Sequence, residues 1–128
     1  MEKEKKVFDL EDRLVDFAVT SLVVCDLLPH SKGGQNLEHQ LSKSGTSAAL
    51  NYGEAQAAES SDDFIHKMKI VLKELRETRI CYKIILKQML SENQFVIKAL
   101  DETNQLIAIF LKSVDTAKKN RENEKRGR

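Results

Sequence analysis

The chain is organised around residues 42–86, SKSGTSAALNYGEAQAAESSDDFIHKMKIVLKELRETRICYKIIL, which contain two helical patterns joined by a short polar segment. In the first pattern, a face with mostly small side chains repeats every three or four residues from Leu37 to Ala55. A row beside it carries almost no side chain, at Gly45, Ala49 and Gly53. Because glycine within a helix costs about 1 kcal/mol relative to alanine, we expect another backbone to approach this row closely. A kinked, weak helix is the alternative.

The second pattern is large and apolar. Its stripe repeats at spacings of four and three, and its members are Phe64, Met68, Val71, Leu75, Thr78, Tyr82, Ile85 and Met89. The preceding residues 60–63, SSDD, provide a helix start, because Ser and Asp side chains cap free amides and suit the positive end of the helix dipole. A small-faced helix folded back on a large-faced helix predicts a helical hairpin as the tightest pair of the fold.

The composition and the short connections between helices predict that this hairpin is part of a larger helical bundle. With 128 residues, 32% charged and 5% aromatic, the chain is typical of one helical domain. Pro29 ends a first helix, residues 30–35 are expected to form a flexible loop, and Asn36 can cap the second helix. Short connections favour antiparallel neighbours. We therefore predict an all-α, antiparallel up-down-up-down four-helix bundle over residues 1–117, with helices at about 9–28, 36–59, 62–90 and 93–117.

The positive charge is concentrated at the end of the chain. Residues 118–128 hold six basic and two acidic side chains, a net charge of +4, whereas the whole chain has a net charge of only +1. The rest of the chain therefore has a net charge of −3. The wholly polar composition predicts that residues 118–128 form a basic, disordered tail.

Cysteine usage and hydropathy bear on the compartment. The two cysteines, Cys25 and Cys81, lie in apolar helical patterns without metal-binding or redox spacing, so buried and reduced thiols are expected. The longest uncharged apolar run, residues 17–25, is too short to span a bilayer, and the first residues lead into no signal-type segment. We expect a cytoplasmic protein that has no membrane partner.

Three helices carry apolar residues outside their main stripes. On the first helix these are Val19, Val23 and Leu27. On the third and fourth helices they are Ile70, Cys81, Ile84, Phe95, Leu106 and Ile109, which we predict to form an oligomer interface. A bundle packed off-axis, with no second copy, is the alternative.

Most catalytic arrangements are absent from the sequence. The closest match to a bundle metal motif is Asp63 followed by His66, and a capping carboxylate beside a surface histidine explains this pair better. No zinc-protease, nucleophile-elbow or phosphate-loop motif occurs. We therefore predict a non-enzymatic protein without a metal or cofactor.

One edge of the third helix is basic over five turns. This edge and the tail supply the candidate nucleic-acid-binding residues Lys69, Lys73, Arg76, Lys83, Lys87, Lys118, Lys119 and Arg121. An ordinary solvated face, supported by a Lys73–Glu77 pair, is the alternative. Tyr82 is the only aromatic residue nearby and belongs to the core stripe, so stacking on single-stranded bases has little support.

Two charged residues are expected to have structural roles. If the hairpin folds back near Ser61, Arg79 lies opposite residues 43–47, whose hydroxyls and carbonyls can satisfy it. The same register places Glu54 near Lys69 and predicts an ion pair between them.

Several motifs in the central hairpin also carry a resemblance. They are SGTS at 44–47, NYxEA at 51–55, AES at 58–60, DFIHK at 63–67 and LKExRET at 72–78. Together they resemble the four-helix-bundle proteins encoded by intervening sequences within bacterial large-subunit ribosomal RNA genes, which are related to the accessory factor of diversity-generating retroelements. The motifs cover about a third of the chain. The sequence departs from the family after Thr78, where Ile80, Cys81 and Tyr82 stand in place of a common tryptophan.

The resemblance implies a closed ring of five bundles, and for the retroelement factor it implies contact with RNA and a reverse transcriptase. Two hypotheses for the function follow. The first is a non-enzymatic oligomeric scaffold, a homopentamer, that binds RNA or another nucleic acid through its basic surface and is associated with the ribosome or its RNA. The second is a protein-interaction scaffold for a polymerase, such as a reverse transcriptase, or for a ribosomal component, without direct nucleic-acid binding.

Overall fold

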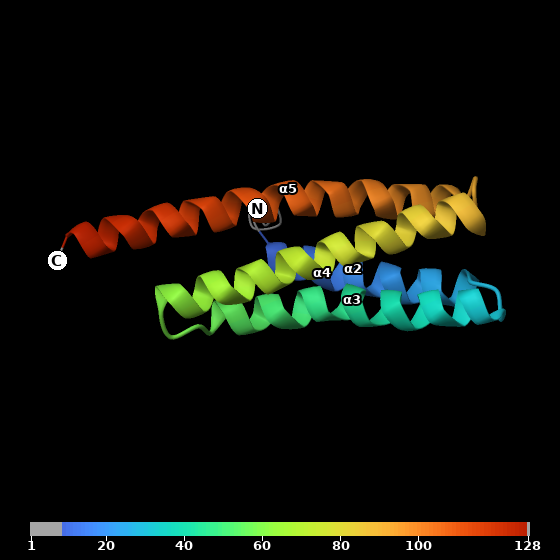
Figure 1. The fold of residues 1–128 in the computed structure, drawn as a ribbon, viewed down its shortest axis with the longest axis horizontal. Coiled ribbons are helices and arrows are strands. Elements are labelled where there is room, and N and C mark those ends of the chain that lie inside the picture. The colour runs from blue at the N-terminus through green and yellow to red at the C-terminus, as the bar shows by residue number, and fades with distance from the viewer. Residues whose placement is uncertain (1–8, 128) are drawn as a thin grey trace, which may run out of the picture.

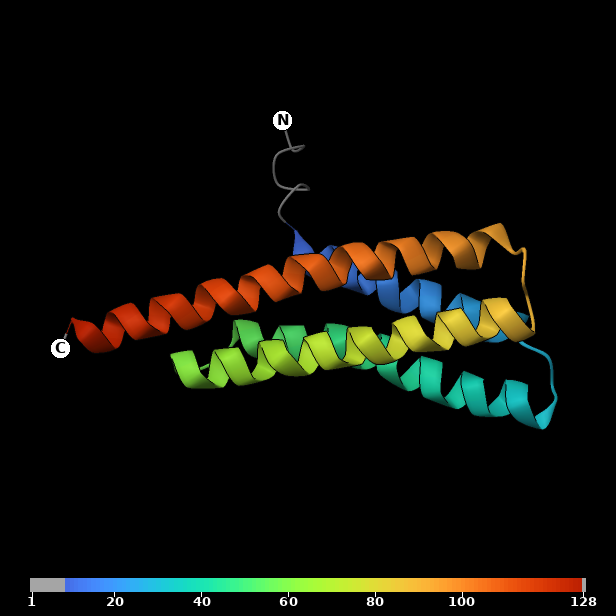
Figure 2. The same ribbon diagram turned by 45° about the horizontal axis from the view of Figure 1, so that its top comes forward.

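The computed structural model describes residues 9–127, which form four long antiparallel α-helices (Figure 1). The helices are α2 (Leu10–Leu27), α3 (Lys32–Gln56), α4 (Ser61–Gln88) and α5 (Gln94–Arg126). No strand occurs within this described range. Figure 2 shows that each helix runs back along its predecessor after a short connection, so the predicted all-α four-helix bundle is confirmed.

Each helix starts at a capping side chain. Asp9, Ser31, Ser60 and Asn93 each accept a hydrogen bond from the backbone amide three residues later. The second helix therefore begins one turn before the predicted Asn36 cap, and residues 32–35 are helical rather than a loop. Gly34 makes this start possible, because a Cβ at that position would collide with the carbonyl oxygen of Pro29.

The contacts between helices are unequal. The α3–α4 contact is the most extensive, as predicted for the central hairpin, and the α4–α5 and α2–α3 contacts follow. The contact between α2 and α5 is the smallest of the four. The bundle is thus a sequence of well-packed neighbouring helices that closes weakly between the first and the last.

The core consists of two apolar clusters separated by hydroxyl groups. One cluster includes Phe17, Leu75 and Phe110, and the other includes Leu41 and Ile85. Along each helix, one buried hydroxyl residue lies between its contributions to the two clusters: Ser21, Ser44, Thr78 and Thr103. These four residues form a polar layer across the middle of the bundle.

The hydrogen bonds of the polar layer are complete. Thr78 donates to the carbonyl of Glu74 at 2.9 Å, so Ser44 is the donor in the 2.7 Å bond between Ser44 and Thr78. In the same way Ser21 donates to the carbonyl of Phe17 at 3.0 Å and accepts from the Tyr82 hydroxyl at 3.2 Å. Satisfied hydroxyls of this kind can be buried at little cost and fix the register of neighbouring helices.

The prediction that another helix approaches the row of Gly45, Ala49 and Gly53 on α3 closely is confirmed at one glycine and wrong at the other. A Cβ on Gly45 would collide with Ser21, so the closely approaching helix is α2 and not the hairpin partner α4. A Cβ on Gly53 would have open space around it. Of the two glycines in this row, only Gly45 is therefore required by packing.

The end of the chain differs from the predicted disordered tail. Helix α5 continues to Arg126 and extends past the loop between α3 and α4 (Figures 1 and 2). Arg121 pairs with Asp62 at 2.9 Å and Ser61 donates to Glu124 at 3.0 Å, so the start of α4 supports this extension. Polar residues with high helix propensity, together with these contacts, explain why the prediction was wrong for residues 118–126. Residues 1–8 and 128, which the predicted domain bounds include, lie outside the described range.

Candidate nucleic-acid interface

A groove of about 590 Å³ runs between α4 and α5. Four basic side chains line it: Lys69, Lys73, Arg76 and Lys118. The three α4 residues lie on one face because they are four and three positions apart, and Lys118 comes from the facing side of α5. We call this site the basic groove. It brings together four of the eight residues predicted to bind nucleic acid.

The floor of the basic groove is apolar. It is formed by Leu72, Ile80, Leu111 and Val114, of which Leu72 and Val114 belong to a core cluster. Ile80 is 51% exposed and Leu111 is 45% exposed. Two acidic residues also line the groove, Glu77 and Asp115, so four bases and two acids give it a net charge of +2.

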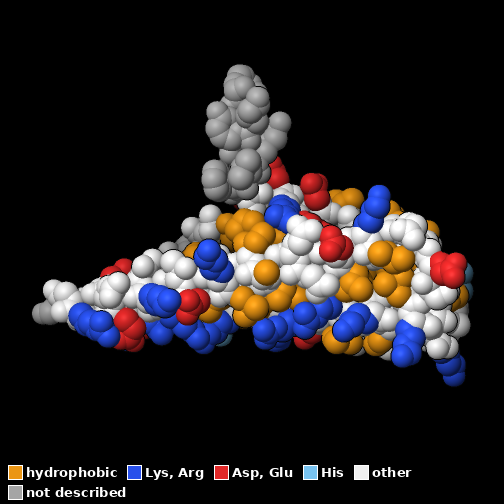
Figure 3. All heavy atoms as spheres, turned by 90° about the horizontal axis from the view of Figure 1, so that it is seen from above, with side chains coloured by type: hydrophobic (Ala, Val, Ile, Leu, Met, Phe, Trp, Pro, Cys, Tyr) orange, Lys and Arg blue, Asp and Glu red, His pale blue; other side chains and the backbone are white. Residues whose placement is uncertain are grey.

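The basic row of α4 continues beyond the groove. Lys83 and Lys87 are exposed like the three α4 bases of the groove, so one face of α4 carries five basic residues. Figure 3 shows Lys and Arg side chains along one long edge of the molecule, with hydrophobic side chains between them. Within the described chain only Lys73 of these five forms an ion pair, with its Nζ 4.0 Å from the Glu74 carboxylate.

Two predicted bases of α5 are not part of the groove. Lys119 pairs with Asp115 at 3.2 Å, and Arg121 pairs with Asp62 at 2.9 Å. These partners neutralise part of the charge that the sequence places at the end of the chain. Lys119 and Arg121 are therefore weaker candidates for phosphate contacts than Lys83 and Lys87.

Only some of the residues predicted to form the oligomer interface are exposed. Cys81 and Leu106 are buried in the core, so neither can contact a second copy. The reason is that α4 and α5 pack against more than one neighbouring element, which buries a wider arc than a single stripe. Ile109 is half-buried against the core and Ile70 is also half-buried, whereas Ile84 and Phe95 are each 44% exposed.

The structure adds surface residues that sequence reasoning missed. Val15 and Leu22 are exposed on α2 beside the expected Val19, Val23 and Leu27. Ile80 and Leu111 belong to the groove floor. The signal for Val15 and Leu22 was present in the sequence, because Val15, Val19 and Leu22 are four and three residues apart and therefore share one helix face.

Neither of the two predicted structural polar contacts forms as expected. Glu54 pairs with Lys67 at 2.6 Å instead of Lys69, because Lys69 lies on the side of α4 that lines the groove. The guanidinium Nε of Arg79 is buried without a hydrogen-bond partner in the described chain. Ser44, which we expected near Arg79, bonds to Thr78 instead.

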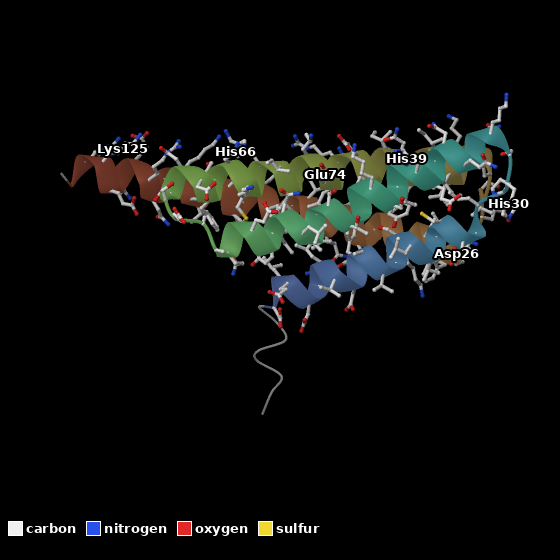
Figure 4. All side chains as sticks on the ribbon, turned by 90° about the horizontal axis from the view of Figure 1, so that it is seen from below. Asp26, His30, His39, His66, Glu74 and Lys125 are labelled. Atoms are coloured by element: carbon white, nitrogen blue, oxygen red, sulfur yellow. The ribbon has the colours of Figure 1, made fainter. Side chains whose placement is uncertain are left out.

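The histidines and cysteines of the described residues do not gather at one place. No cluster of three His, Cys, Asp or Glu residues suited to a metal ion occurs among them. Figure 4 shows His30, His39 and His66 at separate places along the molecule. Both cysteines are buried and free, and burial raises the pKa of the Cys25 thiol to about 11, so this thiol is protonated at neutral pH.

None of the four described helices has the length and apolar content needed to cross a membrane.

Comparison with known proteins identifies the family. The family model for the 23S rRNA-intervening sequence protein matches residues 9–112, which include most of the bundle and the α4 side of the basic groove but not Lys118. The chain belongs to this family. In this member of the 23S rRNA-intervening sequence proteins, Ile80 lines the basic groove and the Tyr82 hydroxyl bonds to Ser21 of the polar layer.

A solved structure supports the fold of this 23S rRNA-intervening sequence protein. The chain resembles a protein of unknown function from the S23 ribosomal protein family of Bacteroides thetaiotaomicron, with a TM-score of 0.74 and 24% sequence identity. The match covers 81% of this chain and 96% of that protein. No curated protein matches the sequence.

Proposed function

We propose that this protein is a non-enzymatic oligomeric scaffold that binds structured RNA through the basic face of α4. The observation that carries the proposal is the row of five exposed bases on one helix face: Lys69, Lys73, Arg76, Lys83 and Lys87. Four of them have no ion pair within residues 9–127, so their charge is available to phosphates. The name of the family also connects it with ribosomal RNA.

The expected mode of binding follows from the side chains. Lysine and arginine contact phosphate oxygens, which position a protein on nucleic acid without reading its sequence. Tyr82, the aromatic residue closest in sequence to this row, is fully buried and cannot stack on a base. Affinity for RNA should therefore depend strongly on salt and weakly on sequence.

Assembly would increase the affinity. The family resemblance implies a ring of five copies, and each copy would repeat the basic row. Several weak sites on one particle raise the overall affinity without any new contact. We therefore include the homopentamer in the proposal.

The test measures retention of a structured RNA as a function of salt, starting at about 50 mM. The key variant is Lys83→Glu with Lys87→Glu, because both residues are exposed and lie outside the basic groove. We expect weaker binding and a shallower dependence of log affinity on log salt, by an amount that reflects the lost phosphate contacts. The matched control, Lys32→Glu with Lys43→Glu, makes the same charge change on α3 and should have the smaller effect.

A second candidate function is favoured by the apolar floor of the basic groove. The exposed side chains of Ile80 and Leu111 add nothing to phosphate binding, whereas they can pack against the apolar face of a helix from a protein partner. The protein would then be a scaffold for a polymerase or ribosomal component without direct RNA contact. Absence of RNA retention at the lowest salt, or equal binding by the Lys83→Glu, Lys87→Glu variant, would favour this second function over the first.

A further inference from the structure

Helix α2 has an outer face that is apolar. Five large aliphatic residues of α2 are between 42% and 55% exposed: Val15, Val19, Leu22, Val23 and Leu27. They are nearly half of the exposed large hydrophobics of the described chain. A surface of this kind along one helix marks a contact with another molecule, since single exposed residues are common but contiguous ones are not.

The same face is acidic. Glu11, Asp12, Asp16 and Asp26 are exposed on α2, and Arg13 is the only base of the helix. Arg13 is already engaged, because its guanidinium donates to Glu102 at 2.7 and 2.9 Å and to Gln105 at 3.0 Å. We call this surface, with its five aliphatic and four acidic residues, the α2 outer face. Its partner must be apolar and basic.

The basic groove has both properties. Its exposed floor residues, Ile80 and Leu111, lie among four bases, and its net charge is +2. Both surfaces thus carry exposed apolar side chains, and their charges are opposite. They belong to different helices of the same chain, so each copy of the protein carries one of each.

Contacts between like surfaces are disfavoured by the same charges. Two α2 outer faces would bring four acids against four acids, and two grooves would bring bases against bases. A two-fold symmetric contact made by either surface alone requires one of these like pairings. A head-to-tail contact, in which unlike surfaces meet, avoids both and can close into a ring.

We infer that the α2 outer face of one copy docks in the basic groove of a second copy. This inference rests on the oligomeric part of the proposed function and assigns the two surfaces that make the contact. The acids of α2 then pair with Lys69, Lys73 and Arg76 of the neighbour. In the assembly the part of the basic row that is open to RNA is therefore reduced to Lys83 and Lys87 of each copy, which lie beyond the groove.

Two variants that each disable one surface test this arrangement. The first is Val19→Gln with Leu22→Gln on α2, and the second is Ile80→Gln with Leu111→Gln in the groove. Both remove exposed apolar side chains without changing the charge or introducing a helix breaker. Leu50→Gln is the matched control, because Leu50 is 67% exposed on α3 and belongs to neither surface.

The masses of the proteins are measured by light scattering at micromolar concentration, alone and mixed. Wild type and Leu50→Gln should be assemblies of more than two copies. Each double variant alone should have the mass of one 14.6 kDa chain. An equimolar mixture should form a 1:1 pair and nothing larger, because only the intact groove of the first variant and the intact α2 of the second can meet. Circular dichroism melting of each variant shows that the fold is retained.

Other outcomes overturn the inference. If the α2 variant alone still assembles, α2 does not make the contact, and if the groove variant still assembles, the groove does not. Two folded monomeric variants that fail to pair would show that the two surfaces do not meet each other. A monomeric wild type would exclude any such contact.

RNA retention by the same samples separates the two proposals. An assembled wild type that retains no RNA contradicts the proposed RNA function and leaves the contact standing. A monomeric wild type that retains RNA contradicts the contact and leaves RNA binding standing.

Discussion

The two sides of α2 are both apolar, but only the inner side has its partner within the described chain. On the inner side Leu14 and Val24 are fully buried, and Ser21 is in contact with Gly45 and Tyr82. On the outer side Val19 is 55% exposed. The difference shows that one hydrophobic pattern serves two kinds of packing, one that forms the bundle and one that we assign to a neighbouring copy.

The chemistry of the two sides differs in the same way. The inner side uses close approach and completed hydrogen bonds, which specify one register. The outer side combines aliphatic residues with acidic residues. This composition suits a surface that is exposed to solvent before assembly and buried after it. Substitutions on the two sides should therefore affect different quantities, and the following experiments use this difference.

The largest effect on folding is expected at Gly45. In Gly45→Ala the new Cβ collides with Ser21, and we expect unfolding free energy to fall by about 1–3 kcal/mol. Gly53→Ala is the matched control on the same helix, and it should increase stability by up to about 1 kcal/mol, because alanine has the higher helix propensity and meets open space. Urea unfolding of both variants measures this. Equal changes at the two positions would contradict a close α2–α3 approach at Gly45.

A smaller effect is expected from Tyr82→Phe, which removes the hydrogen bond to Ser21. Ser21 keeps its bond to the Phe17 carbonyl, so the loss at neutral pH should be about 1 kcal/mol.

The pH dependence of Tyr82→Phe provides a second readout. Burial raises the pKa of the Tyr82 phenol to about 12, above its ordinary value of 10. The protonated phenol therefore stabilises the wild type fully below pH 10, and this stabilisation is lost between pH 10 and 12. The deficit of the variant relative to wild type should shrink across that window. A deficit that is constant from pH 8 to 12 would show that the phenol is not buried.

At the border between the two sides, Arg13→Ala should have a modest effect. The Arg13 side chain is 34% exposed and Glu102 is 35% exposed, so solvent screens their pair and the expected loss is about 0.5–1 kcal/mol. Chemical unfolding of Arg13→Ala, Glu102→Ala and the double variant isolates the coupling. Strict additivity of the two single changes would show that this bridge between α2 and α5 contributes nothing.

The smallest effect on folding is expected on the outer side of α2. Val19→Gln should change the unfolding free energy of the isolated chain by less than about 0.5 kcal/mol, because Val19 makes little contact inside the bundle. The measurement requires a concentration low enough for the wild type to be monomeric, since assembly itself stabilises the fold. A loss comparable to that of Gly45→Ala would mean that Val19 belongs to the monomer core.

The sequence predicts the fold class because helix periodicity is local information. The stripe from Phe64 to Met89 and the caps at Asp9 and Ser60 identify helices without knowledge of their neighbours. Burial on a second face depends on tertiary packing, and this is why Leu106 and Cys81 were assigned to the surface. The helical end of the chain was missed because it depends on contacts with Asp62 and Ser61, which are about sixty residues away.

The candidate site divides in the same way. The basic row of α4 lies on one helix and could be predicted from the spacing of Lys69, Arg76 and Lys83 alone. The groove could not, because Leu111 and Lys118 come from α5 and their position depends on how the two helices pack. The acidic residues of α2 can be read from the sequence. Their assignment to a contact depends on the basic groove, which only the packing of α4 and α5 reveals.

The mass of the full-length chain in solution tests the central claim most directly. That claim is that the outer side of α2 is a contact surface left open by the monomer fold. Light scattering at micromolar concentration should give a mass several times that of the 14.6 kDa chain, and Val19→Gln with Leu22→Gln should reduce it to that of a single chain. A wild type that has the mass of one chain at this concentration would contradict the account.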